Sequence, residues 1–203
     1  IGSVTFGNNR FIAIGNSSSF GDDGSILTST DGITWTESST ETSNKLNSIT
    51  YGNNQFIAVG YRGAILTSSD GISWTERSFG TSCRLVSITF GNDQFVAVGH
   101  YYKVGTVIIT SHDGEIWTEK IIDSKMAINP KSITFGNNQF VVVGSNGVIL
   151  TSEADTHTAL IINNYESKST RRLNIKHVSN QLVIQIPDVK YIMKNMRVSI
   201  FNT

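Results

Sequence analysis

Three aspartates that recur in one short phrase are the first residues to weigh for chemistry. Asp31, Asp70 and Asp113 are each followed directly by glycine and, later in the same phrase, by tryptophan. A carboxylate repeated at one position can accept hydrogen bonds from backbone N–H groups in a turn, glycine can adopt the backbone conformation that the turn needs, and tryptophan can pack its ring between structural units. We therefore predict a structural role for Asp31, Gly32, Trp35, Asp70, Gly71, Trp74, Asp113, Gly114 and Trp117.

The other carboxylates do not form a recognisable catalytic or metal site. Asp22 and Asp23 are adjacent oxygen donors, but calcium needs several more and no second acidic cluster lies near them in the sequence. Glu37, Glu76 and Glu119 each follow a Trp-Thr pair, a repeated position that again indicates a structural role. No triad, zinc or phosphate-loop pattern is present. The sequence predicts neither an enzyme nor a metal site nor a cofactor.

Aromatic and charged residues gather in segments that differ from repeat to repeat. Tyrosine and phenylalanine beside hydroxyl, amide and charged groups can stack on sugar C–H faces while their neighbours bond the hydroxyls. The alternative is that these are ordinary surface loops with incidental aromatic residues. The candidate ligand-binding residues are Phe20, Tyr61, Arg62, His100, Tyr101, Tyr102 and Lys103.

Three cations form a second candidate set. Lys45, Arg84 and Lys131 each lie shortly before the first expected strand of a repeat. If those strands line a central channel, the cations would ring one mouth of it and attract an anionic ligand. Ordinary solvated surface charges are the alternative.

These residues must be positioned by a repeated architecture. A longer phrase begins at Ser3, Ser48, Ser87 and Ser132, a period of roughly 40 residues that is typical of repeat folds. One unit contains four short strand-like runs, at 48–51, 55–59, 64–68 and 73–77, with a Gly-Asn-Asn hairpin turn between the first two. The pattern predicts an all-β fold, a β-propeller built from four-stranded antiparallel blades. A leucine-rich or β-helix solenoid is the alternative, although its coils are usually shorter.

The expected domains follow from the repeats. Residues 1–163 hold the propeller repeats, at about 1–44, 45–83, 84–128 and 129–163, and the fourth repeat has Ala154 and Thr158 where aspartate and tryptophan belong. Residues 164–203 form a β-rich segment, either an extra blade or a truncated sandwich domain. If the four blades do not close a ring, the missing blades lie elsewhere in a longer protein or in a partner chain, which would make an oligomer.

Two resemblances add to this interpretation. Ser-x-Asp-Gly-x-x-Trp resembles the Asp-box, or BNR, repeat of sialidase-like propellers, over about residues 1–152. That resemblance implies that the aspartate hairpins lie away from the functional face. The runs at 180–184 and 198–202 are similar to the C-terminal sorting domains of exported bacterial proteins, which implies an extracellular or cell-surface location in a bacterium. The Arg-Ile-Pro signature of sialidases is absent.

Composition excludes several classes of function. The 203 residues carry 16 basic and 16 acidic side chains, so the formal net charge is zero, and no compact Lys/Arg run with interleaved aromatics indicates a nucleic-acid partner. No apolar run is long enough for membrane insertion by a helix. Cys83 is the only cysteine, so no intramolecular disulfide can form.

The predicted function is a non-catalytic exported binding module. We expect it to recognise carbohydrate or another cell-surface partner, such as a protein, through the variable-loop face. One alternative is a protein-docking assembly or scaffold propeller, as in photosystem assembly factors with similar repeats. A third hypothesis is that the chain is a fragment of a glycoside hydrolase.

Overall fold

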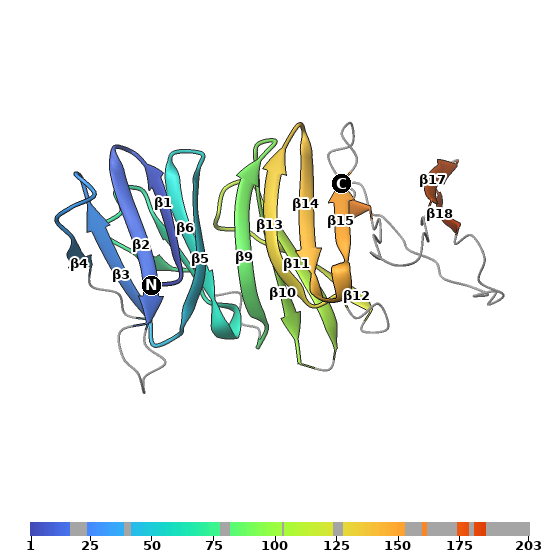
Figure 1. Ribbon diagram of the computed structural model, residues 1–203, viewed down its shortest axis with the longest axis horizontal. Coiled ribbons are helices and arrows are strands. Elements are labelled where there is room, and N and C mark those ends of the chain that lie inside the picture. Colours follow the sequence, from blue (N-terminus) through green and yellow to red (C-terminus); the bar gives the residue numbers. More distant parts are fainter. Residues whose placement is uncertain are drawn as a thin grey trace.

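The protein is nearly all-β, as the repeat predicts. The computed structural model describes residues 1–16, 24–38, 42–77, 82–102, 104–123, 128–152, 160–161, 174–178 and 181–185. Within these residues, four antiparallel sheets of four strands follow one another in chain order (Figure 1). We call these sheets blades 1 to 4. A separate hairpin pairs β17 (Asn174–Val178) with β18 (Gln181–Gln185).

Each blade is a simple meander, with its first strand paired to its second, its second to its third and its third to its fourth. Blade 1 contains β1 (Ser3–Gly7), β2 (Arg10–Asn16), β3 (Gly24–Ser29) and β4 (Thr36–Ser38). Blade 2 contains β5 (Leu46–Gly52), β6 (Gln55–Gly60), β7 (Ile65–Ser68) and β8 (Thr75–Glu76). Blade 3 contains β9 (Arg84–Gly91), β10 (Gln94–Tyr101), β11 (Gly105–Ser111) and β12 (Thr118–Asp123). Blade 4 contains β13 (Pro130–Gly136), β14 (Gln139–Gly144), β15 (Ile149–Ser152) and β16 (Leu160–Ile161).

The predicted Gly-Asn-Asn hairpins are confirmed by their backbone angles. Asn8 and Asn9 have φ values of 44° and 56°, and the flanking residues Gly7 and Arg10 pair directly. Two successive residues at positive φ define the hairpin turn whose twist matches that of its strands. The corresponding turns of the other three blades have the same signs.

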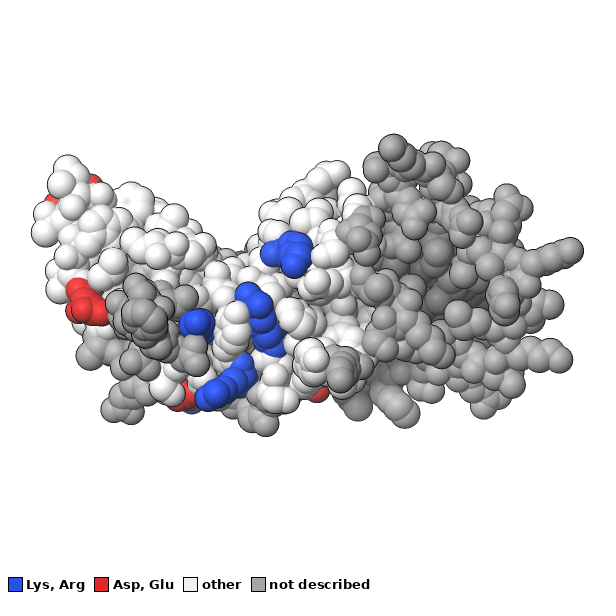
Figure 2. Space-filling view, turned by 60° about the horizontal axis from the view of Figure 1, so that its bottom comes forward, with Lys and Arg blue, Asp and Glu red and all other residues white. Residues whose placement is uncertain are grey.

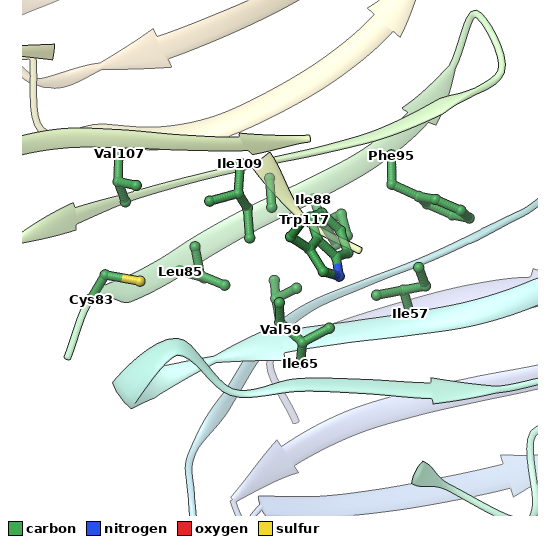
Figure 3. Close-up of a cluster of buried hydrophobic side chains, with 11 residues drawn as sticks. Ile57, Val59, Ile65, Cys83, Leu85, Ile88, Phe95, Val107, Ile109 and Trp117 are labelled. Atoms are coloured by element: carbon green, nitrogen blue, oxygen red, sulfur yellow. The ribbon is translucent and has the colours of Figure 1, made fainter. Parts of the chain in front are cut away.

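The hydrophobic core lies between successive blades. The first strands β1, β5, β9 and β13 lie side by side along the array. Figure 3 shows one cluster, in which Ile57, Val59 and Ile65 of blade 2 face Leu85 and Trp117 of blade 3. Similar clusters join blade 1 to blade 2 and blade 3 to blade 4. Apolar packing between neighbouring blades therefore contributes to the stability of each blade.

The prediction that tryptophan packs between blades holds for two of the three copies. Trp117 is buried against blade 2, and Trp74 is partly buried at the cluster that joins blades 1 and 2. Trp35 of blade 1 is 37% exposed, so the prediction is wrong for that residue. The reason is that, in the described part of the chain, no blade precedes blade 1 and the array does not close into a ring.

One expectation lies partly outside the described residues. β17 and β18 lie within the predicted β-rich segment 164–203, but residues 186–203 are not described. Whether residues 164–203 form an extra blade or a sandwich domain thus stays a prediction. No helix in the described ranges is long and apolar enough to cross a membrane.

Candidate functional site

The repeated aspartates hold tight turns. Asp31 Oδ1 accepts hydrogen bonds from the backbone N–H groups of Thr34 at 2.7 Å and Ile33 at 2.8 Å, and from the Ser29 hydroxyl at 2.9 Å. These bonds stabilise the carboxylate, first those from Thr34 and Ile33, and lower the pKa of Asp31 to about 2. The same bonds recur at Asp70 and Asp113, whose pKa values are also lowered. This geometry gives the three carboxylates a structural task.

Both kinds of turn lie on one face of the molecule. Asn53 in the Gly-Asn-Asn turn of blade 2 donates to the His112 carbonyl, and Gln55 donates to the Asp113 carbonyl at 2.7 Å. Asn8 of blade 1 donates to the Ser69 carbonyl of blade 2. The Gly-Asn-Asn turn of one blade is therefore hydrogen-bonded to the Asp-Gly turn of the next blade. The opposite face carries the variable connections, and we call it the loop face.

Two predicted cations meet a predicted aromatic residue on the loop face. Tyr61 begins the short 3₁₀ turn η1 (Tyr61–Gly63) after β6, and its backbone N–H bonds the Lys45 carbonyl at 2.9 Å. The Arg84 guanidinium lies 4.4 Å from the centroid of the Tyr61 ring, and Lys45 Nζ lies 6.0 Å from it. Cation–π attraction thus orders these charges over one ring. We call Lys45, Tyr61 and Arg84 the cation–aromatic cluster.

A pocket of about 220 Å³ adjoins this cluster. Two of the three predicted channel-mouth cations, Arg84 and Lys131, line it together with His100. They come from the starts of β9 and β13 and from the end of β10, and Asn47 of β5 also lines the pocket, which therefore spans blades 2 to 4. The full lining is Asn47, Arg84, Val86, His100, Pro130 and Lys131.

The pKa of His100 in this pocket is displaced from its ordinary value. Partial burial, followed by the positive charges of Arg84 and Lys131, lowers the pKa of the His100 imidazole. Its Nδ1 atom is buried and has no hydrogen-bond partner among the described residues. An anion placed between Arg84 and Lys131 would offset both positive charges and would favour the protonated form of the His100 imidazole. The pocket is therefore chemically suited to a carboxylate or a similar group.

The remaining predicted residues lie apart from the pocket lining or outside the description. Tyr101 donates its hydroxyl hydrogen bond to Glu119 Oε1 at 2.6 Å, Tyr102 is 83% exposed, and Arg62 is exposed at positive φ within η1. Phe20 and Lys103 lie outside the described residues. The structure thus brings together Lys45, Tyr61, Arg84, His100 and Lys131, whereas Tyr102 and Arg62 do not line the pocket.

Sequence reasoning missed three lining residues. Asn47 and Val86 occupy the same position as Lys131, directly before the serine that starts each long phrase, and Pro130 precedes Lys131. Asn47 is fixed by a 2.6 Å hydrogen bond from its side-chain amide to the Leu85 carbonyl. Aligning the repeats would have found Asn47 and Val86, because equivalent positions of neighbouring blades lie close together.

The distribution of surface charge agrees with the position of Arg84 and Lys131 in one pocket. Basic side chains gather over the middle of the face seen in Figure 2, and the acidic side chains visible in that view lie towards its edges. No group of three or more metal-ligating side chains was found among the described residues. The Asp22–Asp23 pair weighed above lies outside them.

Comparison with known proteins identifies the class of fold. The sequence matches no protein-family model and no curated protein. The structure is similar to YCF48 bound to D1 peptide (TM-score 0.56, 20% identity, covering 92% of this chain and 62% of that one). It is also similar to a chain of the nidogen–laminin complex (TM-score 0.60, 13% identity, 91% and 71% covered) and to an ancestral GH74 enzyme (TM-score 0.56, 21% identity, 74% and 23% covered).

These likenesses, with the four successive four-stranded sheets, show that the fold is a β-propeller whose ring is left open by the described sheets. The chain spans less than two thirds of the length of the two YCF48 structures that it matches. The fold class predicted from the repeats is therefore confirmed.

Proposed function

We propose that this chain is a non-catalytic docking module that binds an acidic segment of a partner protein on its loop face. The observation that carries the proposal is the convergence of Arg84, Lys131 and His100 on one pocket, beside Lys45 and Tyr61. A guanidinium and an ammonium on neighbouring blades can bind one carboxylate from two sides. The bound carboxylate would also favour protonation of His100.

The size of the pocket supports a partner side chain as the occupant. Small-molecule sites usually enclose roughly 300–1,000 Å³, and this pocket is smaller, at about 220 Å³. An aspartate or glutamate side chain needs little space, and the rest of an extended segment would lie across the surrounding loops. Two structural neighbours were solved with a peptide or a protein partner, YCF48 with D1 peptide and nidogen with laminin, which supports docking as the task.

Several carboxylates already accept hydrogen bonds from neighbouring groups of the protein, which supports a non-catalytic role. The three repeated aspartates accept bonds within their own turns. Glu37 accepts a bond from the Ser25 hydroxyl and Glu119 accepts one from Tyr101. A glycosidase needs two carboxyl groups facing one bond of the substrate. The resemblance of the runs at 180–184 and 198–202 to sorting domains supports a location outside a bacterial cell as part of this proposal.

A binding measurement with a charge-matched peptide pair tests the proposal. The probe is a fluorescein-labelled octapeptide of glutamate and serine, with glutamine replacing glutamate in the control peptide. We expect Arg84→Glu to weaken binding of the acidic peptide about tenfold or more, because it removes one charge partner and adds repulsion. Lys120→Glu makes the same charge change on exposed β12 and should alter binding little. Equal binding of both peptides, or equal effects of both variants, would refute the proposal.

Carbohydrate binding is a second candidate, favoured by one observation. Tyr102 presents its ring to solvent with 83% exposure, as a sugar-stacking residue would. Tyr61 is less suited to this task because Arg84 already lies over its ring. A glycan array on the wild-type protein and on Tyr102→Ala separates the two candidates: glycan binding lost in the variant supports this one, and no glycan binding removes it.

A further inference from the structure

A glycine–aromatic contact repeats at every junction between blades. The first strand of each blade ends in an aromatic residue followed by glycine. A Cβ atom added to that glycine would overlap the aromatic ring of the next blade, so only glycine fits there. The pairs are Gly7 with Tyr51, Gly52 with Phe90, and Gly91 with Phe135.

The two ends of the array carry the unused halves of this contact. Phe6 of blade 1 is 55% exposed, whereas the aromatic residues at the same position in the other blades are partly buried. Gly136 of blade 4 is exposed, and a Cβ atom added there would meet none of the described residues within 4 Å. The protein therefore presents an aromatic tab at one end and an empty glycine seat at the other.

A hydrogen bond repeats at the same junctions, and the residues that correspond to its acceptor and donor at the two ends of the described array are exposed. The serine that starts each long phrase accepts a bond from a backbone N–H of the next blade: Ser3 from Ile49 at 3.4 Å, Ser48 from Ile88 at 3.2 Å, and Ser87 from Ile133 at 3.1 Å. Ser132 is exposed at blade 4. Val4, which corresponds to Ile49, is 60% exposed at blade 1.

The apolar side chains at the two ends are complementary in the same way. Val59 of blade 2 is fully buried in the cluster that contains Trp117 of blade 3. Its equivalent in blade 4, Val143, is 41% exposed. Trp35, the equivalent of Trp117 in blade 1, is 37% exposed. Trp35 of one molecule and Val143 of another could thus form the contact that Trp117 and Val59 form within one molecule.

We propose that two copies of this chain join head to tail, with blade 1 of each packed on blade 4 of the other, to close an eight-bladed ring. The occupant of each open end is a second copy, because this chain carries both halves of the tab-and-seat contact, of the serine–amide bond and of the tryptophan contact. Propellers typically contain 4–8 blades, so a ring of eight lies within the known range. A head-to-tail interface makes a closed assembly when its rotation closes and an open filament when it does not.

The solution mass of the full 203-residue chain tests the proposal. Light scattering coupled to size-exclusion chromatography should give twice the 22.2 kDa chain mass at micromolar concentration. Phe6→Glu puts a charge on the tab, and Gly136→Leu fills the seat, so each variant should be monomeric. Tyr102→Glu makes a comparable change to an exposed aromatic on the loop face and should leave the dimer intact.

Mixing the two variants guards against loss of folding as an explanation. Phe6→Glu keeps an intact seat and Gly136→Leu keeps an intact tab, so the mixture should form one sound interface and regain a concentration-dependent dimer. A monomeric wild-type chain, an open polymer, or a dimer that persists in both variants would overturn the proposal. No recovery of dimer in a mixture of variants with native circular dichroism would also overturn it.

Discussion

At the scale of the residue, some charged side chains hold turns and others face a pocket. The aspartates in the turns each accept two backbone N–H bonds on Oδ1. The cations at the starts of β9 and β13 instead face a pocket in which the described residues place no carboxylate. Residue type alone therefore does not distinguish the carboxylates that hold turns from the cations that we propose bind a ligand, whereas the position in the repeat does.

The pKa of His100 should report the charge of its pocket. Burial comes first in lowering this pKa, and Arg84 and Lys131 lower it further. We expect Arg84→Ala to raise the pKa of His100 towards its ordinary value, measured by NMR titration of the imidazole Cε1 proton. His112, exposed on the turn face, is the internal control. A His100 titration unchanged in Arg84→Ala would show that Arg84 does not act on the pocket.

The pH dependence of ligand binding follows from the same group. A bound carboxylate should raise the pKa of His100, so protonation and binding favour each other. Affinity for the acidic peptide should therefore increase as the pH falls through the titration range of His100. His100→Gln should abolish most of this dependence while retaining binding at neutral pH. An equally steep dependence in that variant would assign the effect to another group.

Stability towards acid depends on the turn aspartates. The pKa of Asp31 falls from 3.8 to about 2 on folding, so the folded state favours the ionised carboxylate. This contribution is fully present above pH 3.8 and is lost as the pH falls towards 2. Urea unfolding of Asp31→Asn should show a weaker loss of stability over that interval than the wild type. A slope identical to that of the wild type would contradict a role for the Asp31 charge.

At the scale of the element, the strands are stable because blades cover one another. Trp117→Ala should lower the free energy of unfolding by about 3–5 kcal/mol, since it removes a buried ring between blades 2 and 3. Ile116→Ala is the matched control, because Ile116 lies in the same turn and is 76% exposed. We expect that variant to change stability by about 0.5 kcal/mol or less. Chemical denaturation measures both, and equal losses would argue against packing between blades.

Much of the fold could be predicted from the turns and the repeat period in the sequence, but part of the candidate site could not. The Gly-Asn-Asn turns specify hairpins locally, and the repeat period specifies blades. The exposure of Trp35 could not be predicted, because it depends on whether another blade covers blade 1. Likewise, Tyr61 has the chemistry of a sugar platform in the sequence, and only the packing of η1 against Arg84 shows that its ring is already in contact.

At the scale of the whole molecule, the array separates two surfaces. The turn face is held by repeated hydrogen bonds between blades. The loop face gathers Arg84, His100 and Lys131 from different strands. A rigid scaffold that positions variable connections is a common arrangement for recognition. The central claim is that recognition occurs at this loop-face pocket.

Chemical-shift mapping with the acidic octapeptide tests that claim most directly. Titration of the ¹⁵N-labelled protein should shift the amide signals of Asn47, Arg84, His100 and Lys131 and the His100 imidazole signals, with saturation at a single affinity. Signals from the Gly-Asn-Asn and Asp-Gly turns should stay in place. Shifts centred on those turns, or no saturable shift at the pocket, would contradict the account.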